Sequence, residues 1–170
     1  IGVSLNLLLV VLAAYPLSKE KHHFRFRTVY AWIFFITMIF GGGLIPWYMV
    51  IKELNLLNTI WALVLPGAVP IFLVLIMLNF FRGLPAELEE AALIDGCGHW
   101  RMLFQIFVPL SKPALATIAV HAILGQWNSW FDGLILMNEP NKYPLITYLQ
   151  TAVVNIDYDN LTDAEIQRFA

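Results

Sequence analysis

Few side chains in this sequence are of the types that carry chemistry, so their spacing decides what they could do. The adjacent pair His22 and His23 could ligate a metal ion, but it stands on a short basic loop without carboxylate or cysteine partners at ligand spacing. Cys97 is the single cysteine, which excludes a disulfide within the sequence and suits a small buried or interfacial residue. Neither a His-Glu-x-x-His motif nor a Gly-x-x-x-x-Gly-Lys-Ser/Thr phosphate loop occurs. We therefore expect no catalytic residue, no metal and no cofactor.

A second set of candidates is a polar run inside an otherwise apolar stretch: His121, Gln126, Trp127, Asn128 and Asp132. Ionisable groups at membrane depth are functional candidates, and this set could line a pathway for a polar solute. The alternative is a membrane boundary, with Trp127 and Trp130 in an interfacial aromatic belt and Asp132 within reach of water. His121 is deeper and faces either a partner helix or a cavity. The sequence leaves both interpretations open.

The segment 82–109 has the spacing of a docking element. Pro85 suits a first helical position, the acids Glu87, Glu89 and Glu90 complement the helix dipole, and Gly96 is a natural terminator. A second short helix is predicted over 99–107, with an apolar stripe of Trp100, Leu103, Phe104 and Phe107. Two short amphipathic helices with a glycine break indicate a surface on which a soluble partner binds.

The elements that must position these residues follow from composition. The chain has 170 residues, of which 59% are hydrophobic and 13% charged, whereas an average soluble domain has about 25% charged residues. Four apolar stretches have the length of membrane helices, over about 1–18, 29–51, 59–81 and 112–137. The sequence therefore predicts an all-α, polytopic membrane protein.

Two of these stretches contain helix-breaking residues. Gly41–Gly43 and Pro46 fall in the second stretch, and Pro66, Gly67 and Pro70 fall in the third. Such residues free backbone groups that neighbouring helices or a polar cavity must satisfy. They mark either a hinge or substrate pathway, or merely close helix packing, and the sequence does not separate these alternatives.

Charge predicts the orientation. Seven of the ten Lys and Arg residues fall in the linkers 19–28 and 82–112, whereas Lys52, Lys142 and Arg168 fall on the other side. The positive-inside rule places the first set in the cytoplasm, so 82–109 is a cytoplasmic loop and 138–170 is extracytoplasmic. The basic cluster 19–27 is favoured as a topology determinant; an anionic-lipid or nucleic-acid patch is the alternative.

Glu90-Ala91-Ala92, Gly96, Ile106 and Pro109 carry a resemblance to a known family. Their spacing resembles the cytoplasmic signature of bacterial binding-protein-dependent ABC permeases: Glu-Ala-Ala, three residues, Gly, nine residues, then Ile-x-Leu-Pro. Val108 replaces the leucine. Further segments are similar to the MalG-like carbohydrate permeases and to their LplC-type branch: 56–59, 94–96, 109–113, 41–46 and 127–132.

The resemblance implies an ABC importer type I (MetI-like) fold of six transmembrane helices, of which this chain holds about four and lacks material at both ends. It implies a multi-pass permease of the bacterial cytoplasmic membrane, without nucleic acid as a partner. Its partners would be cytoplasmic ABC ATPase subunits, a second permease, an extracytoplasmic sugar-binding protein and membrane lipid. The permease itself would not hydrolyse ATP.

The resemblance also implies roles for the loop residues. Glu90 would make polar contacts with the ATPase, Ala91 and Ala92 would permit close packing, and Gly96 would permit the turn, with Asp95, Ile106 and Pro109 completing the ATPase-coupling loop. The imported solute would be a carbohydrate, and within this branch an oligosaccharide. A secondary transporter or channel without an ATPase is the alternative, but it needs charged relays inside several helices. An intramembrane enzyme needs a nucleophile–base or metal constellation.

Overall fold

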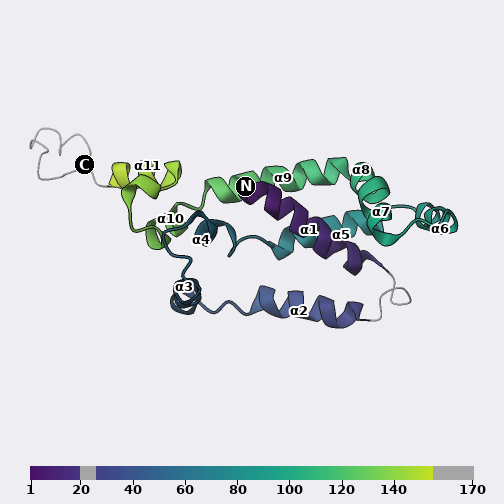
Figure 1. Ribbon diagram of the computed structural model, residues 1–170, viewed down its shortest axis with the longest axis horizontal. Helices are drawn as coiled ribbons and strands as arrows, with labels where there is room; N and C mark the ends of the chain where they lie inside the picture. The colour runs from purple at the N-terminus through teal and green to yellow at the C-terminus, as the bar shows by residue number, and fades with distance from the viewer. Residues whose placement is uncertain (20–25, 155–170) are drawn as a thin grey trace, which may run out of the picture.

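The computed structural model describes residues 1–19 and 26–154, and every regular element in these ranges is helical (Figure 1). The predicted all-α class is therefore confirmed. The elements are α1 (Gly2–Ser18), α2 (Arg27–Ile39), α3 (Leu44–Glu53), α4 (Ile60–Val64), α5 (Ile71–Arg82), α6 (Ala86–Ile94), α7 (His99–Met102), the π-helical turn η1 (Leu103–Phe107), α8 (Val108–Leu110), α9 (Lys112–Trp127), α10 (Trp130–Leu136), the 3₁₀ turn η2 (Pro140–Lys142) and α11 (Leu145–Val154). His22, His23 and residues 155–170 lie outside the described residues.

Helix α1 lies at the centre of the bundle. It packs along α5 and α9, and these helices share one core in which Val10, Ala14, Met77 and Ile118 are fully buried. Small residues on α1 allow this close approach, as is usual where membrane helices pack. By contrast, no residue of α2 is buried. The bundle is thus built around α1, and α2 lies beside it (Figure 1).

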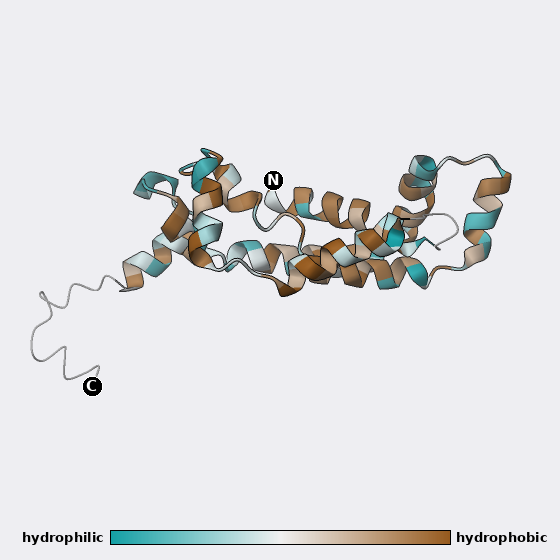
Figure 2. Cartoon of the chain, turned by 90° about the horizontal axis from the view of Figure 1, so that it is seen from below, coloured by the Kyte–Doolittle hydropathy of each residue, from teal (hydrophilic) through white to brown (hydrophobic). Residues whose placement is uncertain are grey.

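Hydropathy divides the molecule along its long axis. Figure 2 shows hydrophobic residues dominating the long helices and hydrophilic residues gathering toward the two ends. Within the described ranges, no single helix has both the length and the apolar composition needed to cross a membrane. Three bent pairs of helices do: α2 with α3 at 115°, α5 with α6 at 74°, and the segment His99–Leu110 with α9 at 81°.

The expected span 29–51 is divided at its glycines. Helix α2 ends at Ile39 and α3 begins at Leu44, with Gly43 between them at a φ of +80°. A positive φ is accessible to glycine without steric cost, and so the chain turns sharply here instead of continuing as one helix. The sequence left open whether these glycines break the helix, and the structure shows a break that redirects the chain by more than a right angle.

The expected span 59–81 is divided at its prolines. Helix α4 ends at Val64, and α5 begins only at Ile71, after Pro66 and Pro70. The break frees the carbonyl of Gly67, which accepts a hydrogen bond of 2.9 Å from Nδ2 of Asn6. Asn6 is 3% exposed, so this buried amide on α1 satisfies a backbone group that the prolines left unpaired.

The expected span 112–137 is divided at Asn128 and Ser129, which separate α9 from α10. Beyond it, α11 packs closely on α10: a Cβ at Gly133 would collide with the side chain of Thr147. Thr147 is fully buried and donates its hydroxyl to the carbonyl of Trp130 at 2.9 Å. Part of the predicted extracytoplasmic segment 138–170 is therefore a packed helix. Which side of a membrane each end faces stays a prediction.

Candidate functional site

The signature residues lie at one end of the long axis, where α6 projects beyond the bundle (Figure 1). Helix α6 begins at Ala86, one residue after the predicted start, because Pro85 caps it instead. Glu87 and Glu89 stand in its first turn, where the helix dipole favours negative charge. Two of the three acids named from the sequence therefore complement the helix dipole, whereas Glu90 stands beyond the first turn.

Gly96 ends α6 in a Schellman motif. Its φ is +71°, its N–H donates to the carbonyl of Leu93 at 3.0 Å, and the next N–H, of Cys97, donates to the carbonyl of Ala92 at 2.9 Å. This pair of bonds satisfies carbonyls that the helix end would otherwise leave unpaired. The spacing from Ala92 to Gly96 in the signature is thus the spacing of a helix stop, and Asp95 is the residue at the cap.

The two alanines of the signature face different surroundings. Ala92 is 5% exposed and packs in the core, whereas Ala91 is exposed. Glu90 is exposed as well. Of these two alanines, Ala91 is the one with an open surface, because the methyl group of Ala92 is already covered by the chain itself.

A buried ion pair ties α6 to the end of α1. Nζ of Lys19 lies 2.7 Å from Oε2 of Glu89, and the two side chains are 6% and 23% exposed. The same ammonium lies 4.5 Å from the ring centroid of Tyr15 and 4.1 Å from that of Phe107, at cation–π distance. Burial lowers the pKa of Lys19, which lies just after the expected span 1–18, and its hydrogen bond and charge interaction with Glu89 oppose that effect.

Aromatic packing holds this pair in place. The rings of Tyr15, Phe81 and Phe107 meet edge to face, with centroids 5.4 to 6.4 Å apart, which stabilises such contacts. The hydroxyl of Tyr15 lies 3.4 Å from Sδ of Met102, which is fully buried. Helices α1, α5, α6 and the segment 99–110 therefore meet around one positive charge.

Sequence reasoning missed this pair. From the sequence, Lys19 was interpreted as part of a basic linker, and Glu89 was expected only to interact favourably with the helix dipole. One signal was available, because Tyr15 and Lys19 stand four residues apart and so lie on one face of α1 as it continues into the linker. An aromatic residue four positions before a lysine at a helix end is a plausible setting for a cation–π contact, although nothing in the spacing identifies Glu89 as the partner.

The second half of the signature turns the chain back into the bundle. The predicted helix over 99–107 is confirmed and continues to Leu110, with a wider π-helical turn over Leu103–Phe107. Pro109 cannot donate a backbone hydrogen bond, and a π turn just before it changes the bonding register. Ile106 packs against the core, while Pro109 is exposed near the corner where α9 departs.

An apolar surface remains open at this end. Its residues project from α6 and from the segment 99–110 and are 38% to 86% exposed: Leu88, Leu93, Ile94, Trp100 and Phe104. The indole of Trp100 and the ring of Phe104 are stacked with centroids 6.3 Å apart. Exposed apolar side chains on a projecting segment are candidates for contact with another protein. That the segment 82–109 is a docking element stays a prediction.

In the part of the chain that the structure describes, no side-chain hydrogen bond or ion pair joins the members of the second predicted set, and its role stays a prediction. His121, Trp127 and Asn128 are exposed, and the imidazole Nδ1 of His121 lies 3.0 Å from the carbonyl of Thr117 one turn earlier. Asp132 is half-buried on α10. Gln126 lines a cavity of about 490 Å³ together with Asn58 and Ser129. Within the described ranges, no cluster of three or more His, Cys, Asp or Glu side chains could hold a metal ion.

The helical bundle and its projecting loop belong to a family of membrane transport proteins. The family model "Binding-protein-dependent transport system inner membrane component" matches residues 22–162. The chain belongs to this family, which confirms the resemblance drawn from the Glu-Ala-Ala signature.

Three relatives refine the comparison. The chain is 41% identical to Protein LplC of Bacillus subtilis over 92% of its own length and 52% of that protein, and 38% identical to the polygalacturonan/rhamnogalacturonan transport system permease protein YtcP of the same organism over 91% and 53%. The crystal structure of a bacterial ABC transporter involved in the import of the acidic polysaccharide alginate matches with a TM-score of 0.84 and 31% identity, over 98% of this chain and 57% of that one. The chain therefore spans about half the length of these relatives.

Proposed function

We propose that this chain forms part of the permease subunit of an ATP-binding-cassette importer that moves a carbohydrate across the bacterial cytoplasmic membrane. One observation supports this most directly. The signature segment forms a rigid helical element that ends in a Schellman motif, projects from the bundle and is bound to its central helix by a buried ion pair. That is the construction expected of a part on which a separate ATPase acts.

The proposed coupling runs from α6 to α1. A cytoplasmic ATPase would dock on the exposed side of α6, where Glu90 offers a charge, Ala91 permits close approach and Ile94 is 86% exposed. When the ATPase dimer closes, α6 would move with it, and the link between Glu89 and Lys19 would pass the displacement to α1. Because α1 packs along both α5 and α9, its movement would rearrange the bundle between inward-facing and outward-facing states.

The relatives support the proposed cargo and partners. YtcP is described as a permease for polygalacturonan and rhamnogalacturonan, and the structural relative imports alginate. We therefore assign an oligosaccharide as the solute, with ATP hydrolysed by a partner protein. An extracytoplasmic binding protein would deliver the solute, and a second permease would complete the pathway together with the side of the chain that carries Gln126, Trp127 and Asn128.

Ile94→Glu in the complete transporter tests this function. The side chain is almost fully exposed, so the substitution leaves the permease core intact while placing a charge in the proposed docking surface. We expect the permease to reach the membrane in normal amount, but to lose the co-purifying ATPase subunits and the carbohydrate uptake. Lys52→Gln, an exposed position on α3, is the matched control.

Normal ATPase co-purification and uptake by Ile94→Glu would show that the docking surface is misassigned. Uptake that persists in a strain without the ATPase genes, and that stops when the proton gradient is collapsed, would favour a secondary transporter instead. The two outcomes are separate, because the first concerns one surface and the second concerns the energy source.

A further inference from the structure

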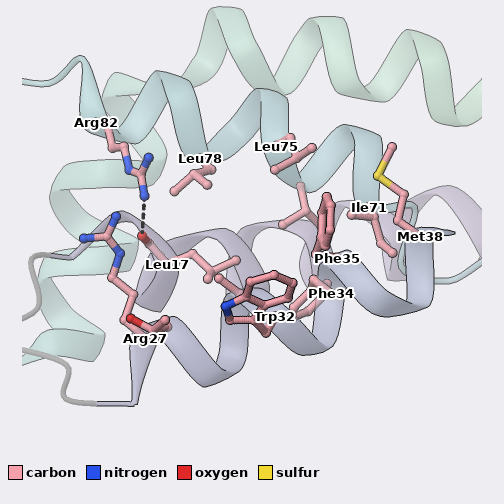
Figure 3. Close-up of a pocket in the computed structure, with 13 residues that line it drawn as sticks. Leu17, Arg27, Trp32, Phe34, Phe35, Met38, Ile71, Leu75, Leu78 and Arg82 are labelled. Atoms are coloured by element: carbon pink, nitrogen blue, oxygen red, sulfur yellow. Dashed lines mark hydrogen bonds between the residues drawn. The ribbon is translucent and has the colours of Figure 1, made fainter.

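A groove of about 540 Å³ runs between α2 and α5, away from the signature loop (Figure 3). Most of its wall is apolar and comes from two helices that carry no charge between their ends: Trp32, Phe35 and Met38 from α2, with Ile71, Leu75 and Leu78 from α5. Both helices belong to the expected membrane region. An open apolar groove of this kind is suited to a hydrocarbon chain.

Two arginines close one end of the groove. Arg27 begins α2 and Arg82 ends α5, and Figure 3 shows both guanidinium groups on the same side of the apolar wall. Nη2 of Arg82 donates to the carbonyl of Leu17 at 3.2 Å. Burial, and to a smaller extent the charge of Arg27, lowers the pKa of Arg82, which is the first residue after the expected span 59–81.

Within residues 1–19 and 26–154, no carboxylate forms an ion pair with Arg27 or Arg82. The ion pairs found there are Lys19–Glu89 and Glu139–Lys142, and neither includes Arg27 or Arg82. Glu89 and Glu90 line the neighbouring polar cavity together with both arginines, but Glu89 is already bound to Lys19. Among the described residues, the end of the groove therefore carries two guanidinium groups and one carboxylate that forms no ion pair, Glu90.

We propose that this groove binds one anionic phospholipid, such as phosphatidylglycerol, with an acyl chain along α2 and α5 and the phosphate between Arg27 and Arg82. Guanidinium groups bind phosphate oxygens through charge-assisted hydrogen bonds, and basic pockets between membrane helices on the cytoplasmic side favour anionic headgroups. The bound phosphate would also relieve the repulsion between the two arginines.

The chemistry distinguishes this occupant from others. A sugar needs polar groups along the wall, and this wall offers aromatic and aliphatic side chains. An apolar helix from elsewhere in the transporter could fill the groove, but among the described carboxylates at this end only Glu90 would then be left to offset the two guanidinium charges. An anionic lipid satisfies the wall and the arginines together. An anionic-lipid patch was already the alternative interpretation of the basic cluster 19–27. The structure adds Arg82, from a distant part of the chain, to one end of the groove.

Native mass spectrometry of the complete transporter tests the proposal. The transporter is reconstituted in nanodiscs of phosphatidylcholine with added phosphatidylglycerol. After the transporter is released from the nanodisc in the spectrometer, the phosphatidylglycerol molecules that stay bound to it are counted. We expect the double variant Arg27→Gln, Arg82→Gln to bind phosphatidylglycerol roughly 10- to 30-fold more weakly. Arg101→Gln is the matched control: Arg101 is an exposed arginine at the same end, and its Nε donates to Gln105.

Equal retention by the double variant and the control would overturn the proposal. A photo-crosslinking amino acid in place of Trp32 gives a second measurement in the presence of both arginines. Adducts with phospholipid support the assignment, whereas adducts with a protein segment would show that a helix fills the groove. Both readouts report lipid binding rather than transport, so they stand or fall separately from the coupling proposed for α6.

Discussion

The pair Lys19–Glu89 makes an asymmetric prediction. Glu89→Gln removes the carboxylate and leaves the Lys19 ammonium, 6% exposed, without its counter-ion. Lys19→Met removes the ammonium, places an apolar chain among Tyr15, Phe107 and Met102, and leaves a carboxylate whose side chain is 23% exposed, although its Oε1 is buried. We therefore expect Glu89→Gln to destabilise the packing of α6 more than Lys19→Met does.

The distance gives the magnitude. At 2.7 Å the gross attraction between unit charges is about 6 kcal/mol at an effective dielectric constant of about 20. Desolvation of the two ions, at several kcal/mol each, offsets most of this, so the intact pair contributes little net stability. Removing one partner of a buried pair costs about 3–5 kcal/mol, because the other charge is left uncompensated. We expect about 3 kcal/mol for Glu89→Gln and, because the Glu89 side chain is less buried than that of Lys19, a smaller loss for Lys19→Met.

Hydrogen exchange in the assembled transporter measures the difference. A local loss of about 3 kcal/mol speeds exchange of the α6 amides by roughly 150-fold when opening is at equilibrium. Glu87→Gln is the control, since this acid stands in the same first turn and is exposed. The double variant Lys19→Met, Glu89→Gln should exchange more slowly than Glu89→Gln alone. An equal effect of Glu87→Gln and Glu89→Gln, or a larger effect of Lys19→Met, would refute the reasoning.

Three further predictions concern the signature loop. Gly96→Ala should destabilise α6 by roughly 1 kcal/mol through its φ of +71°, since nothing lies within 4 Å of an added Cβ, and Gly96→Asn should recover most of that loss in the same exchange assay; equal losses would contradict the backbone explanation. Ala92→Leu should lower the free energy of unfolding by about 1–3 kcal/mol in a thermal unfolding assay, because its site is 5% exposed. Ala91→Leu should leave that free energy within about 0.5 kcal/mol and weaken ATPase co-purification, because Ala91 is exposed. The opposite order of the two stabilities would contradict the assignment of the buried and exposed faces of α6. Cys97 should react with a membrane-impermeant maleimide in inverted vesicles and not in right-side-out vesicles, with Cys97→Ser as the control, and the reverse pattern would invert the topology.

The sequence was informative where one local rule decides the structure. Apolar length and charge predicted helices, Gly96 predicted the end of α6, and the spaced signature predicted the family. Each of these depends on residues close together in the chain. The breaks were also visible as glycines and prolines, but their effect was not, because the angle between α2 and α3 depends on the φ that Gly43 adopts.

The contacts between distant segments could not be predicted in this way. Ala91 and Ala92 are indistinguishable as sequence, and only the packing of α6 against the bundle decides which of them is buried. Lys19 was one basic residue among several in its linker, and its partner is 70 positions away. Likewise, His121 and Asp132 are polar residues in an apolar run whether or not they face a cavity, and the structure leaves His121 exposed.

The two buried polar residues of α1 suggest why this helix is central to the proposed mechanism. Near its start, Asn6 bonds to the carbonyl of Gly67 in the break between α4 and α5; just past its end, Lys19 pairs with Glu89 on α6. These residues are about 20 Å apart along the helix axis at 1.5 Å per residue. A rigid helix bound at one end to the docking loop and at the other to an interrupted helix would carry a displacement of the loop to the break in the bundle. The interruption at Pro66 and Pro70 is then the place where the bundle bends when α6 is moved, which favours the hinge among the alternatives that the sequence left open.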